Sequence, residues 1–220
     1  MKGWPATLRH GDVLVRPLQR SDAAQWRLIR QQSAQWLAPW EATLPPGAGF
    51  PSTSYSSMIR AMRRRARQGA GMPFAVDEGG VMIGQVTVNG ITGGSAQWAS
   101  IGYWIAPEHA GRGITPVAVA LVVDHLLDVV GLHRVEISVR PENVASLRVV
   151  SKLGLEEVGL ARGYLHIAGE WRDHRVFQIL GDGPPGRALA RVSGGGAGPG
   201  TAEGSGGGAG PGAAEDTETS

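Results

Sequence analysis

The stretch of residues 101–115 limits the fold more than any other part of this chain, because a strand pattern runs through two glycines straight into a helix pattern. Residues 101–105 read as a strand, Gly111 and Gly113 form a turn, and residues 112–130 read as a long apolar helix. Glycines in such a turn let the backbone approach a ligand and expose successive N–H groups. Together with the helix N-terminus, these donors predict a site for an anion.

Strand and helix patterns on both sides of this segment indicate a chain of mixed α and β structure. Strands in sequence, followed by strands that alternate with helices, predict an α+β fold with one mixed sheet. Residues 38–53 contain four prolines and are predicted to form a loop. Strands are predicted at 13–18, 72–77, 81–89, 97–105, 134–139, 155–160 and 165–180, and helices at 23–34, 53–68, 112–130 and 144–153.

The C-terminal segment differs in composition from the rest of the chain. Residues 193–220 contain no Lys or Arg, and residues 194–205 are nearly repeated by residues 206–217. Such a Gly- and Pro-rich segment buries too little apolar surface to offset the entropy of ordering. The sequence therefore predicts one domain over residues 1–182 and a disordered Gly/Pro/Ala-rich acidic tail over residues 183–220.

Charge and composition exclude several classes of function. The chain has 21 Lys and Arg against 19 Asp and Glu. Without the four acids of the tail, 21 basic residues face 15 acidic ones, and this net charge of +6 favours an anionic ligand. The absence of cysteine excludes disulfides, thiolate metal sites and cysteine nucleophiles. The absence of cysteine also leads us to expect no metal site. The N-terminus lacks an apolar signal core, and the most apolar run, residues 117–130, is too short to span a bilayer. We therefore expect a cytoplasmic protein that does not use a membrane.

Two common phosphate-binding motifs do not fit the glycine turn. A P-loop requires Lys and then Ser or Thr after its second glycine, whereas Ile114 and Thr115 follow Gly113. A dinucleotide fingerprint requires a third Gly or Ala at the position of Pro116, and no βα unit opens the chain. The anion therefore belongs to another class of ligand.

The turn resembles the signature of the Gcn5-related N-acetyltransferases (GNAT), which is Gln or Arg, two residues, Gly, one residue, and Gly or Ala. Gly111 and Gly113 match its glycines, whereas Glu108 departs from the pattern at the leading position. Residues 143–146 and 152–155 are similar to the second cofactor-contacting helix of that family. The resemblance implies a GNAT fold, an acyl-CoA N-acyltransferase with a splayed central mixed sheet flanked by helices.

Three further segments, residues 37–41, 101–105 and 169–174, are similar to the RimJ/RimL branch of the family. Members of that branch acetylate the N-terminal residue of ribosomal proteins, and RimJ is associated with the alanine of small-subunit protein S5. The resemblance thus implies an N-terminal acetyltransferase that acts on a ribosomal protein.

The resemblance also implies acetyl-coenzyme A as co-substrate and indicates where it lies. Its pyrophosphate would lie on the N–H groups of residues 111–115, with Arg112 available for a phosphate. Its pantetheine arm would pair with the strand edge, and two side chains of the later helix would lie near the thioester. The expected cofactor residues are Ile105, Ala106, Ala110, Gly111, Arg112, Gly113, Ile114, Thr115, Asn143 and Ser146.

The identity of the amine determines how strong a base is needed. A peptide α-amine has a pKa of ~7.7–8.0 and a lysine side chain one of ~10.4, so near neutrality far more of the former is uncharged. A weak base or a water relay therefore suffices for an N-terminal amine. This matters because Ser100 occupies the place where many relatives carry an acid.

We assign hypothetical roles to a few side chains on this basis. Glu41 is the candidate amine anchor and base, directly or through water, and Ser146 is the candidate proton donor to the thiolate. The N–H of Ile105 or its neighbour is the candidate donor to the acetyl carbonyl. Tyr103 is a further catalytic candidate, with core packing as its alternative. The expected substrate-binding residues are Trp40, Glu41, Ser100 and Asp173.

Alternatives to this function remain open at the level of sequence. The chain could acetylate a small-molecule amine or an antibiotic, or it could be a non-catalytic CoA-binding regulatory module. The basic run Arg63 to Arg67 is either a solvated helix face or a weak contact with the ribosome. A nucleic-acid-binding module is less well supported, because this run lacks interleaved aromatic residues. The oligomeric state, monomer or homodimer, is open.

Overall fold

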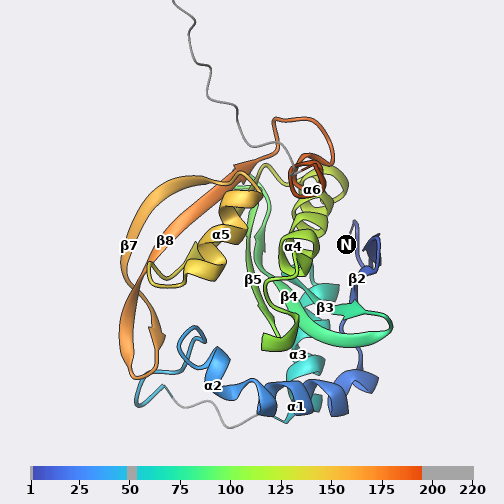
Figure 1. Ribbon diagram of the computed structural model, residues 1–220. Coiled ribbons are helices and arrows are strands. Elements are labelled where there is room, and N and C mark those ends of the chain that lie inside the picture. Colours follow the sequence, from blue (N-terminus) through green and yellow to red (C-terminus); the bar gives the residue numbers. More distant parts are fainter. Residues whose placement is uncertain (1, 49–53, 195–220) are drawn as a thin grey trace, which may run out of the picture.

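Figure 1 shows the computed structural model of the protein, which describes residues 2–48 and 54–194. The described strands form one sheet in the order β1-β2-β3-β4-β5-β6-β8-β7. Neighbouring strands are antiparallel except for β5 and β6, which are parallel, so the predicted α+β fold with a mixed sheet is confirmed. The strands are β1 (Leu8–His10), β2 (Val13–Pro17), β3 (Gly71–Glu78), β4 (Val81–Thr92), β5 (Trp98–Ile105), β6 (Arg134–Val139), β7 (Glu156–Ile167) and β8 (Glu170–Leu180).

Helices cover the sheet in two groups. Helices α4, α5 and α6 share the larger core cluster, in which Val119, Val150 and Ala188 are buried against the sheet. Helices α1 and α3 share the smaller cluster, built around Ile29 and Ile59. The helices are α1 (Ala23–Gln32), α2 (Ala34–Leu37), α3 (Tyr55–Arg67), α4 (Ile114–Asp124), α5 (Val144–Lys152) and α6 (Arg187–Ser193), with 3-10 turns at Arg20–Asp22 and Pro107–His109 and a π-helical segment at His125–Val130.

The parallel pair β5 and β6 opens into a splay. Their residues pair only from Trp98 with Arg134 to Ser100 with Glu136, although both strands continue beyond this point. Beyond Ser100, the edge of β5 that faces β6 has no strand beside it. In Figure 1, α5 lies between β5 and the curved β7–β8 ribbon on the other side of the opening. The predicted splayed sheet is thus present.

Several boundaries differ from those the sequence predicts. The predicted helix 112–130 begins at Ile114 and widens to π-helical pitch from His125. The predicted last strand, 165–180, is interrupted at residues 168–169, where β7 turns into β8. Ala168 and Gly169 both have positive φ there, and the left-handed conformation of an alanine carries no sequence signal as strong as that of a glycine. Residues 49–53 of the predicted loop lie outside the described residues.

A helix that the sequence does not predict, α6, lies within the segment assigned to the tail. Its first turn is held by a carboxylate of α4, because Asp124 accepts hydrogen bonds from the N–H groups of Ala188 (3.0 Å) and Leu189 (2.9 Å). Ala188 is fully buried. At the other end, Arg191 donates to the carbonyl oxygen of Gly154 (2.8 Å), just beyond α5. The folded part of the chain therefore extends past residue 182, because contacts remote in sequence stabilise α6.

Removal of the carboxylate that holds α6 should destabilise this end of the domain. Asp124→Ala leaves two N–H groups without their acceptor, and the loss of such a cap costs about 1 kcal/mol (range ~0.5–2) in the free energy of unfolding. Burial raises the pKa of Asp124, so protonation favours the folded state. The difference between wild type and variant should thus be largest at low pH and decrease as the pH rises through that pKa.

Urea unfolding measured across pH tests this expectation, and hydrogen exchange in residues 187–193 shows whether α6 is released first. Asp182→Ala is the matched control, because Asp182 is exposed and makes only a long 3.4 Å contact with Arg187. Equal losses in both variants would contradict the assigned role of Asp124.

In the described part of the chain, no helix has the length and apolar character needed to cross a bilayer.

Candidate active site

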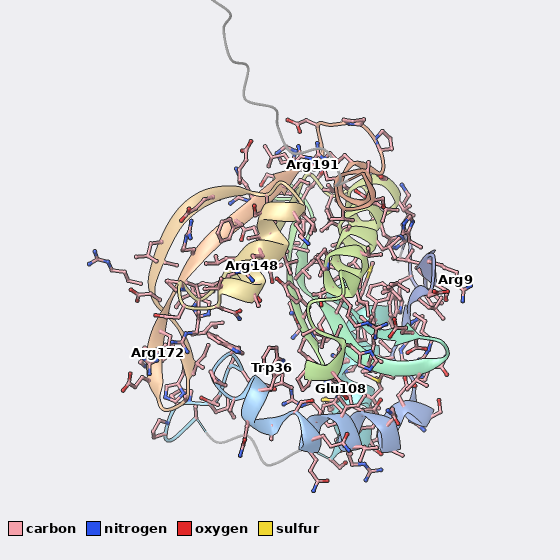
Figure 2. All side chains as sticks on the ribbon, in the orientation of Figure 1. Arg9, Trp36, Glu108, Arg148, Arg172 and Arg191 are labelled. Carbon is pink, nitrogen blue, oxygen red and sulfur yellow. The ribbon has the colours of Figure 1, made fainter. Side chains whose placement is uncertain are left out.

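A cavity of about 610 Å³ lies at the splay of β5 and β6. Four parts of the chain build its wall: the α1–α2 region, the end of β5, the glycine turn and α5. Figure 2 shows Trp36 of α2 and Arg148 of α5 on different sides of this space, and Arg172 on the distant β7–β8 ribbon. The lining residues include Arg30, Trp36, Trp40, Glu41, Tyr103, Trp104, Ile105, Ala110, Gly111, Gly113, Thr115, Glu142, Asn143, Ser146, Arg148 and Lys152.

The glycine turn presents bare backbone to the cavity. Gly111 (φ +77°) and Gly113 (φ +82°) are left-handed, a conformation that side chains with a Cβ rarely adopt. A Cβ at either position would meet no described atom within 4 Å, so the space in front of both residues is open. Gly113 is the N-cap of α4, and the N–H groups of Ile114 and Thr115 in its first turn have no intrahelical acceptor. This geometry suits a phosphate group.

The Arg112 side chain does not take part in the cavity wall. Its guanidinium donates two hydrogen bonds to the carboxylate of Glu78, at 2.7 and 2.9 Å, and Nδ1 of His109 lies 3.0 Å from the same carboxylate. The side chain that the resemblance offers to a phosphate is therefore held by Glu78 at the end of β3. The interaction ties the glycine turn to the sheet.

The end of β5 directs one backbone N–H toward the splay. The N–H of Ala106 donates to the carbonyl of Ile83 on β4 (2.9 Å), and Ala106 is buried outside the cavity. Because successive N–H groups of a strand point to opposite edges, that of Ile105 points away from β4 and toward the cavity. Of the two predicted cofactor residues here, the structure places Ile105 at the wall.

Helix α5 brings both polar and basic groups to the cavity. Asn143 is its N-cap and accepts a hydrogen bond from the N–H of Ser146 (3.0 Å). One turn further along, Arg148 and Lys152 line the cavity on the same side of the helix, four residues apart. Neither makes an ion pair with a side chain of residues 2–48 or 54–194. They give this part of the wall an uncompensated positive charge suited to phosphates.

Tyr103 carries the most perturbed titratable group at the cavity. Burial raises the pKa of its hydroxyl to about 12, an effect slightly offset by the neighbouring Ser146 hydroxyl. No hydrogen bond of normal geometry joins the Tyr103 hydroxyl to any described residue. A buried phenol without a partner is protonated at neutral pH and has a proton to donate.

The loop that carries Glu41 is held from two sides. Arg30 of α1 forms an ion pair with Glu41 and lies between two indoles, 5.6 Å from the ring centre of Trp26 and 5.5 Å from that of Trp104. Arg140 of the segment after β6 also contacts this loop, because it donates to the carbonyl of Pro39 (2.6 Å) and lies over the ring of Trp40. Trp40 and Glu41 are thus fixed at the cavity wall.

Two predicted substrate residues lie elsewhere. Ser100 sits where β5 and β6 still pair, and its hydroxyl faces the carbonyl of Asn89 at 3.5 Å. Asp173 accepts a hydrogen bond from the N–H of Gly163 (2.8 Å) within the β7–β8 ribbon. Neither belongs to the cavity wall. Ile114 is buried, so the structure offers its backbone, not its side chain.

Sequence reasoning missed several wall residues. The missed charged residues are Arg30, Glu142 and Arg148, and the missed indole is Trp104. The spacing of Arg148 and Lys152, four residues apart on a helix whose first turn carries Asn143, would have indicated one basic face. No comparable signal existed for Arg30, whose position depends on how α1 packs. Among the described residues, no three His, Asp or Glu side chains converge as a metal site requires.

Comparison with known proteins agrees with this geometry. Residues 12–156 match the family model described as the acetyltransferase (GNAT) domain. The chain belongs to the GNAT acetyltransferase family. It is thus an acetyl-CoA-dependent N-acetyltransferase, as the glycine turn and the splayed sheet indicate. The predicted GNAT fold is confirmed.

Individual relatives support this assignment. RimJ of Mycobacterium smegmatis, solved in complex with CoA-disulfide, is 35% identical with a TM-score of 0.80, over 88% of this chain and 97% of that one. The [ribosomal protein uS5]-alanine N-acetyltransferase of Escherichia coli (strain K12) is 28% identical over 80% of this chain and 91% of its own length. YjcK of Bacillus subtilis (strain 168), named a probable N-acetyltransferase, is 43% identical over 99 residues, which span 45% of this chain and 55% of YjcK.

Proposed function

We propose that this GNAT enzyme moves the acetyl group of acetyl-CoA to the N-terminal α-amine of a protein, namely a ribosomal protein that begins with alanine. Relatives that match most of this chain are named as acetyltransferases of an alanine in a ribosomal protein. The observation that carries the proposal is the cavity itself, in which a bare glycine turn, a buried phenol and a carboxylate line one continuous wall.

The cavity wall fits acetyl-CoA on three counts. The N–H groups of the glycine turn and the cations of Arg148 and Lys152 suit its phosphates. The free edge of β5 suits an amide-bearing arm that adds to the sheet as an extra strand. Asn143 and Ser146, at the start of α5, face the region where the thioester would then lie.

Acetyl-CoA carries its acetyl group as a thioester, from which the thiolate of coenzyme A leaves. The residues of the cavity wall assist the transfer of the acetyl group to the amine. The amine nitrogen bonds to the carbonyl carbon, the C–S bond breaks, and the amine gives up one proton. The N–H of Ile105 polarises the carbonyl, and Glu41 receives the amine proton directly or through water. The Tyr103 hydroxyl, adjacent to Ser146, gives a proton to the thiolate and regains one from solvent.

Replacement of the proposed base should affect the acceptor half of the reaction. Glu41→Gln removes the acceptor of the amine proton, so kcat/KM for an alanine-initiated peptide should fall about tenfold or more near pH 7. The deficit should shrink toward pH 9, because a peptide α-amine with a pKa of ~7.7–8.0 is then mostly uncharged. Affinity for acetyl-CoA should not change.

A thiol-release assay run from pH 6.5 to 9 measures this effect. Glu170→Gln is the matched control, because Glu170 is also an exposed carboxylate paired with an arginine, Arg172, but lies outside the cavity wall. A Glu41 variant with wild-type turnover at every pH would remove Glu41 from the mechanism.

Mass spectrometry of intact ribosomal proteins tests the identity of the acceptor directly. Intact ribosomal proteins from cells with and without this gene should differ by one acetyl group on a single protein. In vitro, an alanine-initiated peptide should be acetylated, whereas the same peptide with a blocked N-terminus and a free lysine should not. Acetylation of polyamines or aminoglycosides in preference to the peptide would instead indicate a small-molecule acetyltransferase.

A further inference from the structure

Helix α3 carries a stripe of arginines that the cavity does not use. Arg60, Arg63, Arg64 and Arg67 are spaced at i, i+3, i+4 and i+7 and are all exposed. This spacing places them on one side of the helix, whereas Tyr55, Ile59 and Ala66 are buried on another. We call these four residues the α3 stripe.

The charge of the α3 stripe is not balanced within the described part of the molecule. No ion pair joins any of the four arginines to an acid of residues 2–48 or 54–194. Residues 54–76 contain no acid at all, and the acids of residues 20–41, Asp22 and Glu41, are bound by Arg16 and Arg30. Like charges three and four residues apart destabilise a helix. A surface with several unpaired cations favours the binding of a polyanion.

The α3 stripe fits the phosphate backbone of RNA better than it fits a membrane. An interfacial helix inserts large apolar side chains beside its basic ones, and none of the exposed large apolar residues of the described chain belongs to α3. Guanidinium groups bind phosphate oxygens in pairs of hydrogen bonds, whereas base recognition by stacking needs aromatic side chains, which the stripe lacks. The contact would therefore be independent of sequence.

The position of α3 links this surface to the acceptor side of the cavity. Helix α3 packs beside α1, where the rings of Tyr55 and Trp26 lie 5.2 Å apart. Helix α1 in turn supplies Arg30 to the cavity wall. Both helices lie at the lower end of the molecule in Figure 1, where α1 leads into α2. A large partner that binds α3 would thus lie near the entrance used by an acceptor.

We propose that the α3 stripe binds the phosphate backbone of folded RNA and so brings the enzyme to an acceptor protein held in an RNA-rich particle. The second half of this statement rests on the proposed function, since it assumes a ribosomal acceptor. The RNA contact itself does not depend on catalysis and can be tested alone.

The test compares two variants of the full chain that lose the same charge. The first is R63Q/R64Q/R67Q, and the control is K2Q/R9Q/R162Q, three exposed cations outside α3. Binding to a fluorescently labelled 20-base-pair RNA duplex is measured by anisotropy as a function of salt concentration. The stripe variant should bind at least about tenfold more weakly at low salt, with a slope of log K against log salt reduced by about 3, one for each lost phosphate contact. The control should change far less.

Equal weakening in both variants would overturn the proposal, because it would indicate attraction by net charge alone. Wild-type binding to vesicles containing phosphatidylserine, without binding to the duplex, would also overturn it in favour of a membrane.

A measurement of acetyltransferase activity separates this inference from the proposed function. The stripe variant should acetylate a free peptide like wild type yet show a raised KM for intact small ribosomal subunits. If wild type acetylates no peptide, the proposed function fails while the duplex result still decides the RNA contact.

Discussion

Replacement of Tyr103 by phenylalanine is expected to lower kcat by about 10²-fold or more, the usual contribution of a general acid, with little change in KM for acetyl-CoA. The Tyr103 side chain is partly buried at the cavity wall, and its buried hydroxyl lies beside Ser146 without a hydrogen-bond partner of normal geometry. In the proposed mechanism this hydroxyl gives a proton to the departing thiolate. Because the hydroxyl makes no hydrogen bond of normal geometry, its removal should cost little stability, and Tyr103→Phe should unfold at the same urea concentration as wild type, or a higher one.

Tyr55→Phe provides a matched control for this substitution. Burial raises the pKa of Tyr55 to about 12 as well, but its hydroxyl donates to the carbonyl of Gln19 (2.7 Å) and lies outside the cavity wall. Tyr55→Phe should therefore lose about 1 kcal/mol of stability and keep its kcat. The two tyrosines should thus show opposite patterns of stability and turnover.

Ser146→Ala decides between the two proposed proton donors. If Ser146 is the donor, its loss should reproduce the fall in kcat, and Tyr103→Phe should be nearly neutral. If Tyr103 is the donor, it stays protonated below its pKa of about 12, so kcat should show no loss from its ionisation up to about pH 10. Steady-state kinetics of Tyr103→Phe, Tyr55→Phe and Ser146→Ala between pH 7 and 10 distinguish these outcomes.

Replacement of Gly113 by valine is the second change with a large expected effect, and it should act on acetyl-CoA. The residue is left-handed (φ +82°) at the N-cap of α4, and its front is open to the cavity. A β-branched side chain there strains the backbone by about 1–3 kcal/mol and occupies the space proposed for a phosphate of acetyl-CoA. We expect KM for acetyl-CoA to rise about 100-fold, which corresponds to the loss of one or two N–H hydrogen bonds to a charged group.

Gly94→Val separates backbone strain from loss of binding. Gly94 is also left-handed (φ +64°) and would likewise place a Cβ near no described atom, but it lies in the turn between β4 and β5, outside the cavity wall. Both variants should lose similar stability, and only Gly113→Val should lose affinity for acetyl-CoA in calorimetric titration. Equal affinities in the two variants would mean that the glycine turn does not hold the co-substrate.

Local patterns predicted the elements that surround the site. The alternation of residues 134–139 gives β6 with the same bounds as observed. The strand, the glycine turn and the helix after it follow in the predicted order, although α4 begins at Ile114, two residues later than predicted. These elements follow from the spacing of apolar residues and from the positive φ that a glycine permits, both of which depend on neighbouring residues alone.

The fate of individual side chains did not follow from such patterns. Arg112 lies in the predicted motif, but a carboxylate 34 residues earlier, Glu78, holds its guanidinium away from the cavity. Asp173 belongs to a segment similar to relatives of known function, but it binds the backbone of the adjacent strand. The partner of a charged side chain is set by whichever residue the fold places beside it, and sequence spacing does not report this.

The sequence by itself determined the family, the order of the elements and the bare amide turn, because each of these is written in contiguous residues. The tertiary structure alone decided that β5 and β6 part after Ser100, that Arg30 and Arg140 clamp the Glu41 loop, and that α6 folds against Asp124. The physical reason is the distance along the sequence over which each interaction acts. Backbone conformation responds to the nearest few residues, whereas burial, ion pairing and the shape of a cavity arise between segments that can lie more than a hundred residues apart, as Arg140 and Pro39 do.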